Sequence, residues 1–440
     1  MQHNLAHVMK ESIILQVLEE QKEETTSMSY EKWTDRYEES QFEWESALAQ
    51  VVIGVRRCGK STLCHKVLLQ HGCTYGYVNF DDDRLADLHA EDLNTLLNCL
   101  YQLYGTEIKY LFFDEIQNVD GWHLFVNRLL RQGFHVFLTG SNARLLSSEL
   151  STHLTGRYNE IRLYPFSYRE TCQYKGISTA SRTTKADASR KATLTAYLHE
   201  GGMPELSNIR LPQNRLSYVE GVFETIITKD IVGRYKLHHS ESLRRIAHHL
   251  TNNFCQEIST SALAEISGLK SEKTIQKYVS YLSQAFLIIR LQKFSFKSRE
   301  RIHNEKAYSI DLGLIDNRIN ALLPEIAGWR LENVVLIELL RRHRSMADDL
   351  YYYKPTSRSK EVDFVVCRRG IVEELIQVAY DIDNAKTFRR ETESLTNASD
   401  KLHCKNLTLI SYTETRDIDV HGHTIHLYNI IDWLLAVGNL

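Results

Sequence analysis

The feature that most constrains the fold is a glycine-rich segment that begins at Gly54 and ends at Ser61. Its sequence, GVRRCGKS, fits the pattern G-x-x-x-x-G-K-[ST] at every fixed position. The apolar residues 51–53 precede it, and residues with helical spacing follow it from Thr62. In such a turn, backbone N–H groups and the helix dipole both favour a bound anion. The sequence therefore predicts an α/β fold with a phosphate-binding loop between a strand and a helix.

The side chains of this loop have predicted roles in binding a nucleotide. Lys60 would reach the β- and γ-phosphates, and the Ser61 hydroxyl would bind Mg²⁺. The other loop residues expected around the phosphates are Gly54, Arg56, Arg57, Cys58, Gly59 and Thr62. The alternative is a chance glycine-rich turn, which would need none of these side chains.

A short apolar segment, KYLFFDE at residues 109–115, ends in two adjacent carboxylates. Asp114 would lie near the Mg²⁺ hydration shell, and Glu115 would polarise an attacking water as general base. Alone, this segment would be an ordinary buried strand with a solvated end. Because it follows the glycine-rich loop, we interpret it as catalytic. A protein that only binds nucleotide does not need Glu115, so its presence favours hydrolysis.

From about residue 50 to 170 the chain resembles the ATPase domain of a prokaryotic AAA/STAND-like family. The resemblance rests on GVRRCGKST (54–62), YVNFDDDRL (77–85), YLFFDEIQNVDGW (110–122), FLTGSNARLLSSEL (137–150), LTGRY (154–158) and LYPFSYRE (163–170). Downstream, GGMPEL (201–206) and residues 329–380 resemble the family's C-terminal domain of unknown function. The resemblance implies an ATP-binding and ATP-hydrolysing protein and leaves its biological task open. The chain departs from the family in a longer N-terminal leader and a polar insertion at 176–193.

Two segments of this resemblance carry further candidate catalytic residues. In AAA ATPases a polar side chain after the third strand, here 135–140, lies between the carboxylates and the γ-phosphate. Ser141 and Asn142 are the candidates, although both also suit a helix N-cap. Arg157 is the candidate for an arginine that reaches the transition-state charge, in its own subunit or in a neighbouring one. The alternative for Arg157 is a surface ion pair.

Composition is compatible with this interpretation. The chain has 440 residues, 43% of them hydrophobic and 25% charged, so two to four domains are expected. The eight cysteines form no C-x-x-C pair, and we interpret them as thiols in a reducing cytoplasm. The sequence shows no apolar run near 18 residues, which argues against a membrane span, and we expect no membrane partner.

Residues 241–315 are predicted to form a winged helix. A short helix ends at Gly268, Ser271 caps a second helix, and two strands follow with a basic turn through Arg299 and Arg301. The range 229–306 contains 14 Lys and Arg residues but 7 Asp and Glu, in a chain of net charge −3. This asymmetry favours double-stranded DNA as a partner. The residues expected to face DNA are Lys273, Gln276 and Lys277. The alternative is a packing or protein-contact module with a solvated basic face.

The C-terminal segment, 316–440, is similar to the PD-(D/E)xK nuclease core. In that core a helix Glu, a strand Asp and an E-x-K on the next strand hold Mg²⁺ and orient a water. Glu332 and Asp363 match the first two positions, but Gln377 and Ala379 stand at the E-x-K positions. An amide binds Mg²⁺ less well than a carboxylate, and alanine cannot orient water. We therefore expect no DNA cleavage, since even the nearest substitute, Lys386, has no support in the sequence.

The predicted organisation has five parts. They are a helical leader (1–45), a P-loop ATPase core (46–170), a helical lid with a polar insertion (171–240), the winged helix (241–315) and the nuclease-like α/β domain (316–440). We expect an ATPase that couples its nucleotide state to DNA or to another protein, and oligomerisation is compatible with this. The alternatives are a nucleotide-gated binding protein with negligible turnover and an ATP-regulated nuclease.

Overall fold

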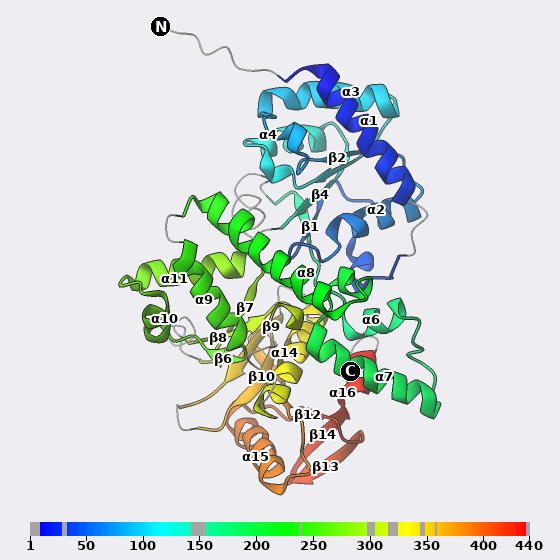
Figure 1. Ribbon diagram of the computed structural model, residues 1–440. Coiled ribbons are helices and arrows are strands. Elements are labelled where there is room, and N and C mark those ends of the chain that lie inside the picture. Colours follow the sequence, from blue (N-terminus) through cyan, green and yellow to red (C-terminus); the bar gives the residue numbers. More distant parts are fainter. Residues whose placement is uncertain are drawn as a thin grey trace. The chain divides into compact units, whose positions relative to one another are not determined.

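The computed structural model of the chain describes residues 9–28, 33–141, 154, 156–237, 240–296, 304–315, 324–343, 348–356 and 359–436. Asn142, Arg299 and Arg301 lie outside these ranges. The chain divides into two compact units between Leu163 and Tyr164 (Figure 1). None of the helices formed by the described residues is long and apolar enough to cross a membrane.

Unit 1 is built on a parallel five-stranded sheet in the order β2-β3-β4-β1-β5. Its strands are β1 (Ala49–Ile53), β2 (Tyr75–Asn79), β3 (Tyr110–Asp114), β4 (His135–Gly140) and β5 (Tyr158–Arg162). Its longer helices are α1 (Glu11–Met28), α2 (Lys60–Gln70), α3 (Leu93–Tyr104) and α4 (Trp122–Arg131). Every residue of β1 is buried, as expected for a central strand of a parallel sheet that helices cover. The predicted α/β class with a parallel sheet is confirmed.

The segment predicted as a separate leader belongs to unit 1. Helix α1 packs against α3 and β2 (Figure 1). The Gln21 side chain accepts a hydrogen bond from the Asn79 N–H at 2.9 Å and donates to the Asn79 carbonyl at 3.2 Å. Because the Gln21 amide both accepts from and donates to the backbone of Asn79, it connects α1 to the end of β2. The expected boundary at residue 45 therefore does not separate two compact bodies.

Unit 2 begins with helices and ends with a mixed sheet. Its helical elements are α6 (Tyr168–Tyr174), α7 (Thr184–Glu200), α8 (Pro212–Thr225), the π-helix η7 (Ile226–Gly233), α9 (Ser240–Asn252), α10 (Thr260–Ser267) and α11 (Glu272–Gln284). A three-stranded antiparallel sheet, in the order β6-β8-β7, is formed by β6 (Gln256–Glu257), β7 (Ile288–Gln292) and β8 (Glu305–Ser309).

The polar insertion expected over 176–193 is partly helical. Thr183 caps α7 by accepting a hydrogen bond from the Ala186 N–H at 3.2 Å. The Arg190 guanidinium then donates to the carbonyls of Ser178 and Ser181 at 2.9 and 2.6 Å. Because one buried arginine satisfies two loop carbonyls, the loop before α7 is held against the helix. The polar insertion is therefore helical from Thr184 onward.

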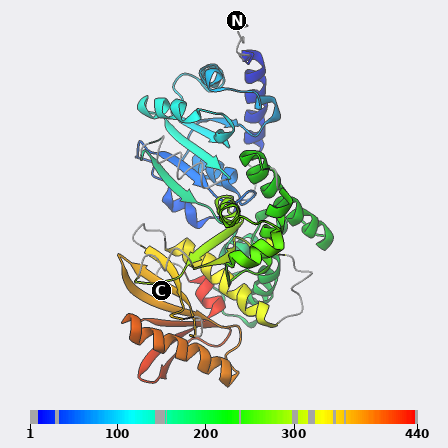
Figure 2. The same cartoon turned by 90° about the vertical axis from the view of Figure 1, so that its left-hand side faces the viewer.

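The C-terminal sheet has the order β13-β14-β12-β11-β10-β9. Its elements are α14 (Pro324–Arg342), β9 (Asp348–Tyr353), β10 (Val362–Arg368), β11 (Ile371–Val378), α15 (Ala385–Leu402), β12 (Leu407–Ser411), β13 (Arg416–Val420), β14 (His423–Asn429) and α16 (Ile430–Leu435). Along β10, Phe364 and Val366 join one apolar core and Val365 joins another. Residues of α14 line the first core and residues of α15 line the second, so the sheet is covered on both faces (α15 is orange in Figure 2).

The GGMPEL segment has a structural role in unit 2. The buried Asp311 carboxylate accepts hydrogen bonds from the N–H groups of Gly202 and Gly313 at 2.7 and 2.8 Å. Burial raises the pKa of Asp311 to about 6. The Gly202 carbonyl accepts from the Phe166 N–H at 2.7 Å. A Cβ at Gly202 would lie 2.1 Å from the Phe166 carbonyl oxygen, a distance that no side chain tolerates.

Gly202→Ala is therefore expected to destabilise the chain, by about 1–3 kcal/mol as for other overpacked sites. Gly221→Ala is the matched control, because a Cβ there meets no atom within 4 Å and Gly221 lies inside α8. The control should stabilise by about 0.5–1 kcal/mol, since alanine favours a helix interior. Thermal unfolding of both variants checks this. Equal melting temperatures for the two variants would contradict the steric account.

Candidate functional site

The carboxyl ends of three neighbouring strands form the candidate nucleotide site of unit 1. In the parallel register, Ile53 of β1 pairs with Gly140 of β4, and Phe113 of β3 pairs with Leu138 of β4. The residues that follow each strand therefore meet at one edge of the sheet. The phosphate-binding loop, the two adjacent carboxylates and the polar end of β4 are brought together in this way, as the sequence predicts.

The Lys60 side chain folds back over the backbone of its own loop. Gly59 caps α2 with φ 99° and ψ 24°, a conformation that favours glycine. The Lys60 ammonium, which is only 6% exposed, donates to the carbonyls of Gly54 and Val55 at 3.2 Å each. It also lies 3.9 Å from Glu115 Oε1. The side chain therefore sits close to both the loop backbone and the second carboxylate.

The loop packs tightly against the end of β5. A Cβ at Gly54 would lie 2.1 Å from the Leu163 carbonyl oxygen, so only glycine fits at this position. The buried Cys58 thiol donates to the same oxygen at 3.6 Å, and burial raises the pKa of Cys58. Arg56 lies 3.6 Å from Asp81. The remaining two side chains predicted here, Arg57 and Thr62, are exposed.

Asp114 is a buried carboxylate with three hydroxyl donors, one of which is Tyr77, whose hydroxyl donates to Oδ2 at 3.4 Å. The Ser61 hydroxyl and the Thr139 hydroxyl both hydrogen-bond to it, and the latter donates to Oδ1. Burial and the charge of Glu115 raise the pKa of Asp114, and the Ser61 and Thr139 hydroxyl groups oppose this rise. A serine hydroxyl and a carboxylate side by side are oxygen donors of the kind that Mg²⁺ binds. The donor set at Ser61 and Asp114 therefore fits the predicted metal.

Glu115 has a left-handed backbone, with φ 55° and ψ 38°. Its N–H donates to Thr139 Oγ1 at 3.1 Å. Its Oε2 accepts hydrogen bonds from the Gln117 amide and, at 3.4 Å, from the Ser141 hydroxyl. A non-glycine residue in this conformation costs about 1–3 kcal/mol and persists where neighbours hold it, often at functional sites. Here Thr139, Gln117 and Ser141 hold it.

Thr139 and Gln117 are site residues that the sequence interpretation missed. Thr139 bridges the two carboxylate residues, whereas the predicted Ser141 donates a hydrogen bond to Glu115. Residues two apart on a strand share a face, so Thr139 and Ser141 should have been considered together. Gln117 follows Glu115 in the short 3₁₀ helix η4 (Ile116–Asn118), which no sequence pattern predicts.

Arg157 lies at the amino-terminal ends of the strands, whereas the loop lies at their carboxyl ends. Ala49, the first residue of β1, pairs with Tyr158, the first residue of β5, and the two strands run parallel. The loop follows the last residue of β1. A five-residue strand rises by about 16 Å, which exceeds the reach of an arginine side chain. Arg157 is exposed, and the geometry does not favour a contact with a nucleotide in its own subunit.

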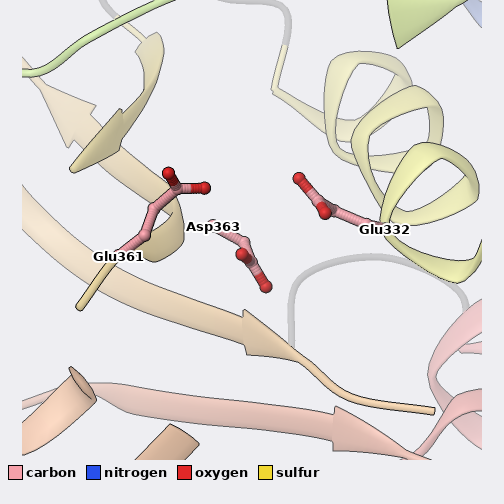
Figure 3. Close-up of side chains that lie close together, drawn as sticks. All are labelled: Glu332, Glu361 and Asp363. Carbon is pink, nitrogen blue, oxygen red and sulfur yellow. The ribbon is translucent and has the colours of Figure 1, made fainter. Parts of the chain in front are cut away.

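A second cluster of charged side chains lies in unit 2. Among the described residues, the carboxylates of Glu332, Glu361 and Asp363 have oxygen atoms within 4.8 Å of one another (Figure 3). The Lys306 ammonium contacts Glu361 and lies 3.4 Å from Glu332. Tyr308 donates to Glu332 at 2.7 Å. Burial alone would lower the pKa of Lys306, but the three carboxylates outweigh it and raise that pKa. Lys306 is thus an internal counter-ion of the cluster.

This cluster differs from the predicted one in two residues. Glu332 and Asp363 are together as expected, but Glu361 supplies the third carboxylate and Lys306 of β8 supplies the ammonium. The substitute considered in the sequence, Lys386, instead lies at the start of α15. Gln377 donates to Glu391 at 2.8 Å. Glu361 and Asp363 are two apart, which could have revealed Glu361, whereas no sequence pattern links Lys306 to them.

Comparisons with known families and proteins agree with part of this picture. A family model described as an AAA domain matches residues 46–172. A second, described as a domain of unknown function, matches residues 191–322. This second range includes the GGMPEL segment and ends before residue 329, where the resemblance seen in the sequence was expected to continue.

Two relatives match over most of the chain. The uncharacterized protein MJ1544 of Methanocaldococcus jannaschii is 33% identical over 402 residues, which are 88% of this chain and 88% of the relative. An uncharacterized protein of Haemophilus influenzae is 32% identical over 402 residues, which are 88% of this chain and 94% of the relative.

Similarity to solved structures is weaker. The Cdc6p structure from Pyrobaculum aerophilum is 12% identical, with a TM-score of 0.26, and the match covers 72% of this chain and 98% of that one. The RuvB Holliday junction branch migration motor of Thermotoga maritima is 16% identical, with a TM-score of 0.23, and the match covers 64% and 90%. Likeness at this level decides neither the fold nor the function of this chain.

Proposed function

Because the chain belongs to the family of AAA-domain proteins that includes the Methanocaldococcus jannaschii and Haemophilus influenzae relatives, we propose that it binds ATP with Mg²⁺ and hydrolyses it. The observation that supports this most is the convergence of Lys60, Ser61, Asp114 and Glu115 at one edge of a parallel sheet. Membership of this family supports an AAA-type ATPase domain. That this domain hydrolyses ATP is our proposal.

Each of these side chains has a role in the proposed reaction. Lys60 would leave the carbonyls of Gly54 and Val55 and bind the β- and γ-phosphates. Ser61 and Asp114 would hold Mg²⁺, which neutralises phosphate charge when bound. Glu115 would accept a proton from the attacking water.

The polar neighbours of Glu115 would set the position of this general base. Ser141 and Gln117 both contact Oε2, and Thr139 fixes the backbone N–H. Because Ser141 also lies at the end of β4, it remains a candidate for contact with the γ-phosphate. Asn142 keeps the same proposed role from the sequence alone. A protein with this site that binds ATP without turning it over would be a nucleotide-gated binding protein, which is the second candidate function.

We further propose that residues 241–315 form a winged helix that binds double-stranded DNA. Helices α9, α10 and α11 precede the antiparallel pair β7 and β8, an order typical of this module. On α11, the side chains of Ile275 and Tyr278 are buried, whereas those of Lys273, Gln276 and Lys277 are exposed. An exposed basic helix face supports a phosphate contact. A protein partner at the same face is the alternative.

For the C-terminal sheet we propose docking or recognition without DNA cleavage. The Lys306 ammonium already contacts Glu361 and lies 3.4 Å from Glu332, so a divalent cation would have to displace a buried lysine. Removing one partner of a buried ion pair is costly, which opposes such an exchange.

Lys60→Ala is expected to abolish ATP binding, because the phosphates lose their closest ammonium. Glu115→Gln should retain binding and lose turnover by about 10²-fold, the usual size of a general-base contribution. Equilibrium binding of a fluorescent ATP analogue and steady-state phosphate release measure the two effects. Equal and mild effects of both changes would place the active site elsewhere. Tight binding with undetectable wild-type turnover would favour the second candidate function.

Arg157 is expected to contact the nucleotide of a neighbouring subunit, because it lies too far from the loop of its own subunit. Turnover per chain should then rise with protein concentration, and Arg157→Ala should lower it with little change in ATP affinity. Arg131→Ala, another exposed arginine of unit 1, is the control. Turnover that does not depend on concentration and is equal in both variants would show that Arg157 is only a surface residue.

DNA binding through the winged helix should weaken steeply with salt, because it rests on phosphate neutralisation. The double variant Lys273→Glu/Lys277→Glu should lose duplex DNA affinity and keep ATP affinity. Lys386→Glu/Lys401→Glu, on exposed positions of α15, is the control for an equal change of net charge. Fluorescence anisotropy at low and high salt measures this. Absence of DNA binding at low salt would leave a protein-contact module.

The C-terminal sheet is expected not to cleave DNA with Mg²⁺ or Mn²⁺. Incubation of the chain with supercoiled plasmid, with and without ATP, tests this by the loss of the supercoiled band. Metal-dependent nicking that disappears in Asp363→Ala would overturn the expectation and make an ATP-regulated nuclease the leading function.

A further inference from the structure

The segment before β1, to which no sequence motif assigns a function, lies beside the phosphate-binding loop. The short 3₁₀ helix η1 (Tyr37–Gln41) follows Arg36, whose side chain is 8% exposed. The Arg36 guanidinium donates through Nη1 to the Cys58 carbonyl oxygen at 3.2 Å. A Cβ at Gly59 would lie 3.5 Å from the same Nη1. The guanidinium therefore lies against the peptide bond that joins Cys58 to Gly59.

The orientation of this peptide bond matters for an anion. In a trans peptide the carbonyl and the following N–H point in opposite directions. A donor that holds the Cys58 oxygen on one side therefore turns the Gly59 N–H to the other. Backbone N–H groups of the loop bind phosphate, whereas a carbonyl oxygen in their place would repel it. The orientation of this peptide bond therefore decides whether the Cys58 carbonyl or the Gly59 N–H can face a phosphate.

Lys66 holds the segment in place. This buried lysine of α2 donates to the Thr34 carbonyl at 3.1 Å, to Asp35 at 2.7 Å and to Glu39 at 2.6 Å. Glu39 also accepts the Arg36 N–H at 2.6 Å. Three acceptors for one ammonium satisfy all of its donors. Lys66 of α2 therefore holds the segment in the position where Arg36 contacts the loop.

We propose that Arg36 is a positioning residue for the nucleotide phosphates, because it holds the Cys58 carbonyl away from them and turns the Gly59 N–H toward them. The inference rests on the proposed ATP function and adds a residue from outside the loop to that site. Arg36 acts through the loop backbone, so it affects ATP and ADP alike.

Arg36→Met removes the donor and keeps much of the side-chain length. We expect its dissociation constants for ATP and ADP to rise about tenfold, the effect of one lost hydrogen bond to a charged group. Arg36→Lys keeps a donor and should recover part of the loss. Arg84→Met is the matched control, because Arg84 also belongs to unit 1 but pairs with Glu20 and Asp82 at the surface. Displacement of a fluorescent ADP analogue by ATP or ADP measures the dissociation constants of the wild type and of the three variants.

A wild type that binds neither ATP nor ADP would overturn the proposed function itself. A wild type that binds, with an Arg36→Met variant of equal affinity, would overturn only the role of Arg36. An Arg36→Lys variant as weak as Arg36→Met would also count against the carbonyl contact. If Arg36→Met does not fold, Lys66→Met decides. It loosens the segment without changing Arg36, and unchanged ADP affinity in it would overturn the inference.

Discussion

The candidate nucleotide site depends on the hydroxyl group of Thr139. This group donates to Asp114 and accepts the N–H of Glu115, so one atom fixes the side chain of the first carboxylate and the backbone of the second. It can do so only because β3 and β4 are parallel neighbours with Phe113 opposite Leu138. The left-handed conformation of Glu115 is held by the same contact. The register of two strands thus determines where a proposed general base lies.

The phosphate-binding loop is held from outside as well as by its own glycines. Gly54 lies against the Leu163 carbonyl, where any side chain would clash. Arg36 holds the Cys58 carbonyl, and Lys66 seats the segment that carries Arg36. Leu163 and Arg36 contact the loop from two different parts of unit 1. Such supports keep backbone N–H groups oriented before an anion arrives, which reduces the ordering that binding would otherwise require.

The sequence predicted the residues that local patterns define and missed those that tertiary contacts define. A strand, a glycine-rich turn and a helix follow one another along the chain, so Lys60, Ser61, Asp114 and the parallel sheet were accessible from spacing alone. Thr139 lies two residues before Ser141 and Glu361 two residues before Asp363, so both were accessible in principle. Arg36, Gln117 and Lys306 were not, because their contacts with the sites depend on how distant or irregular segments fold back. The boundary expected at residue 45 agrees with the start of the AAA-domain match at residue 46. That α1 packs against α3 and β2 in the same compact unit was not accessible from the sequence, because it is a tertiary contact.

The measurement that tests the central claim most directly is the rate of ATP hydrolysis by Thr139→Val compared with Thr139→Ser, at saturating ATP. Valine has the shape of threonine without the hydroxyl, so the Asp114 oxygen and the Glu115 N–H lose their shared partner. Serine keeps the hydroxyl. We predict that Thr139→Val binds ATP but hydrolyses it at least about tenfold more slowly, since a buried group left without its partner costs about 1–3 kcal/mol. Thr139→Ser should stay close to the wild type. Equal rates for the two variants would contradict the account.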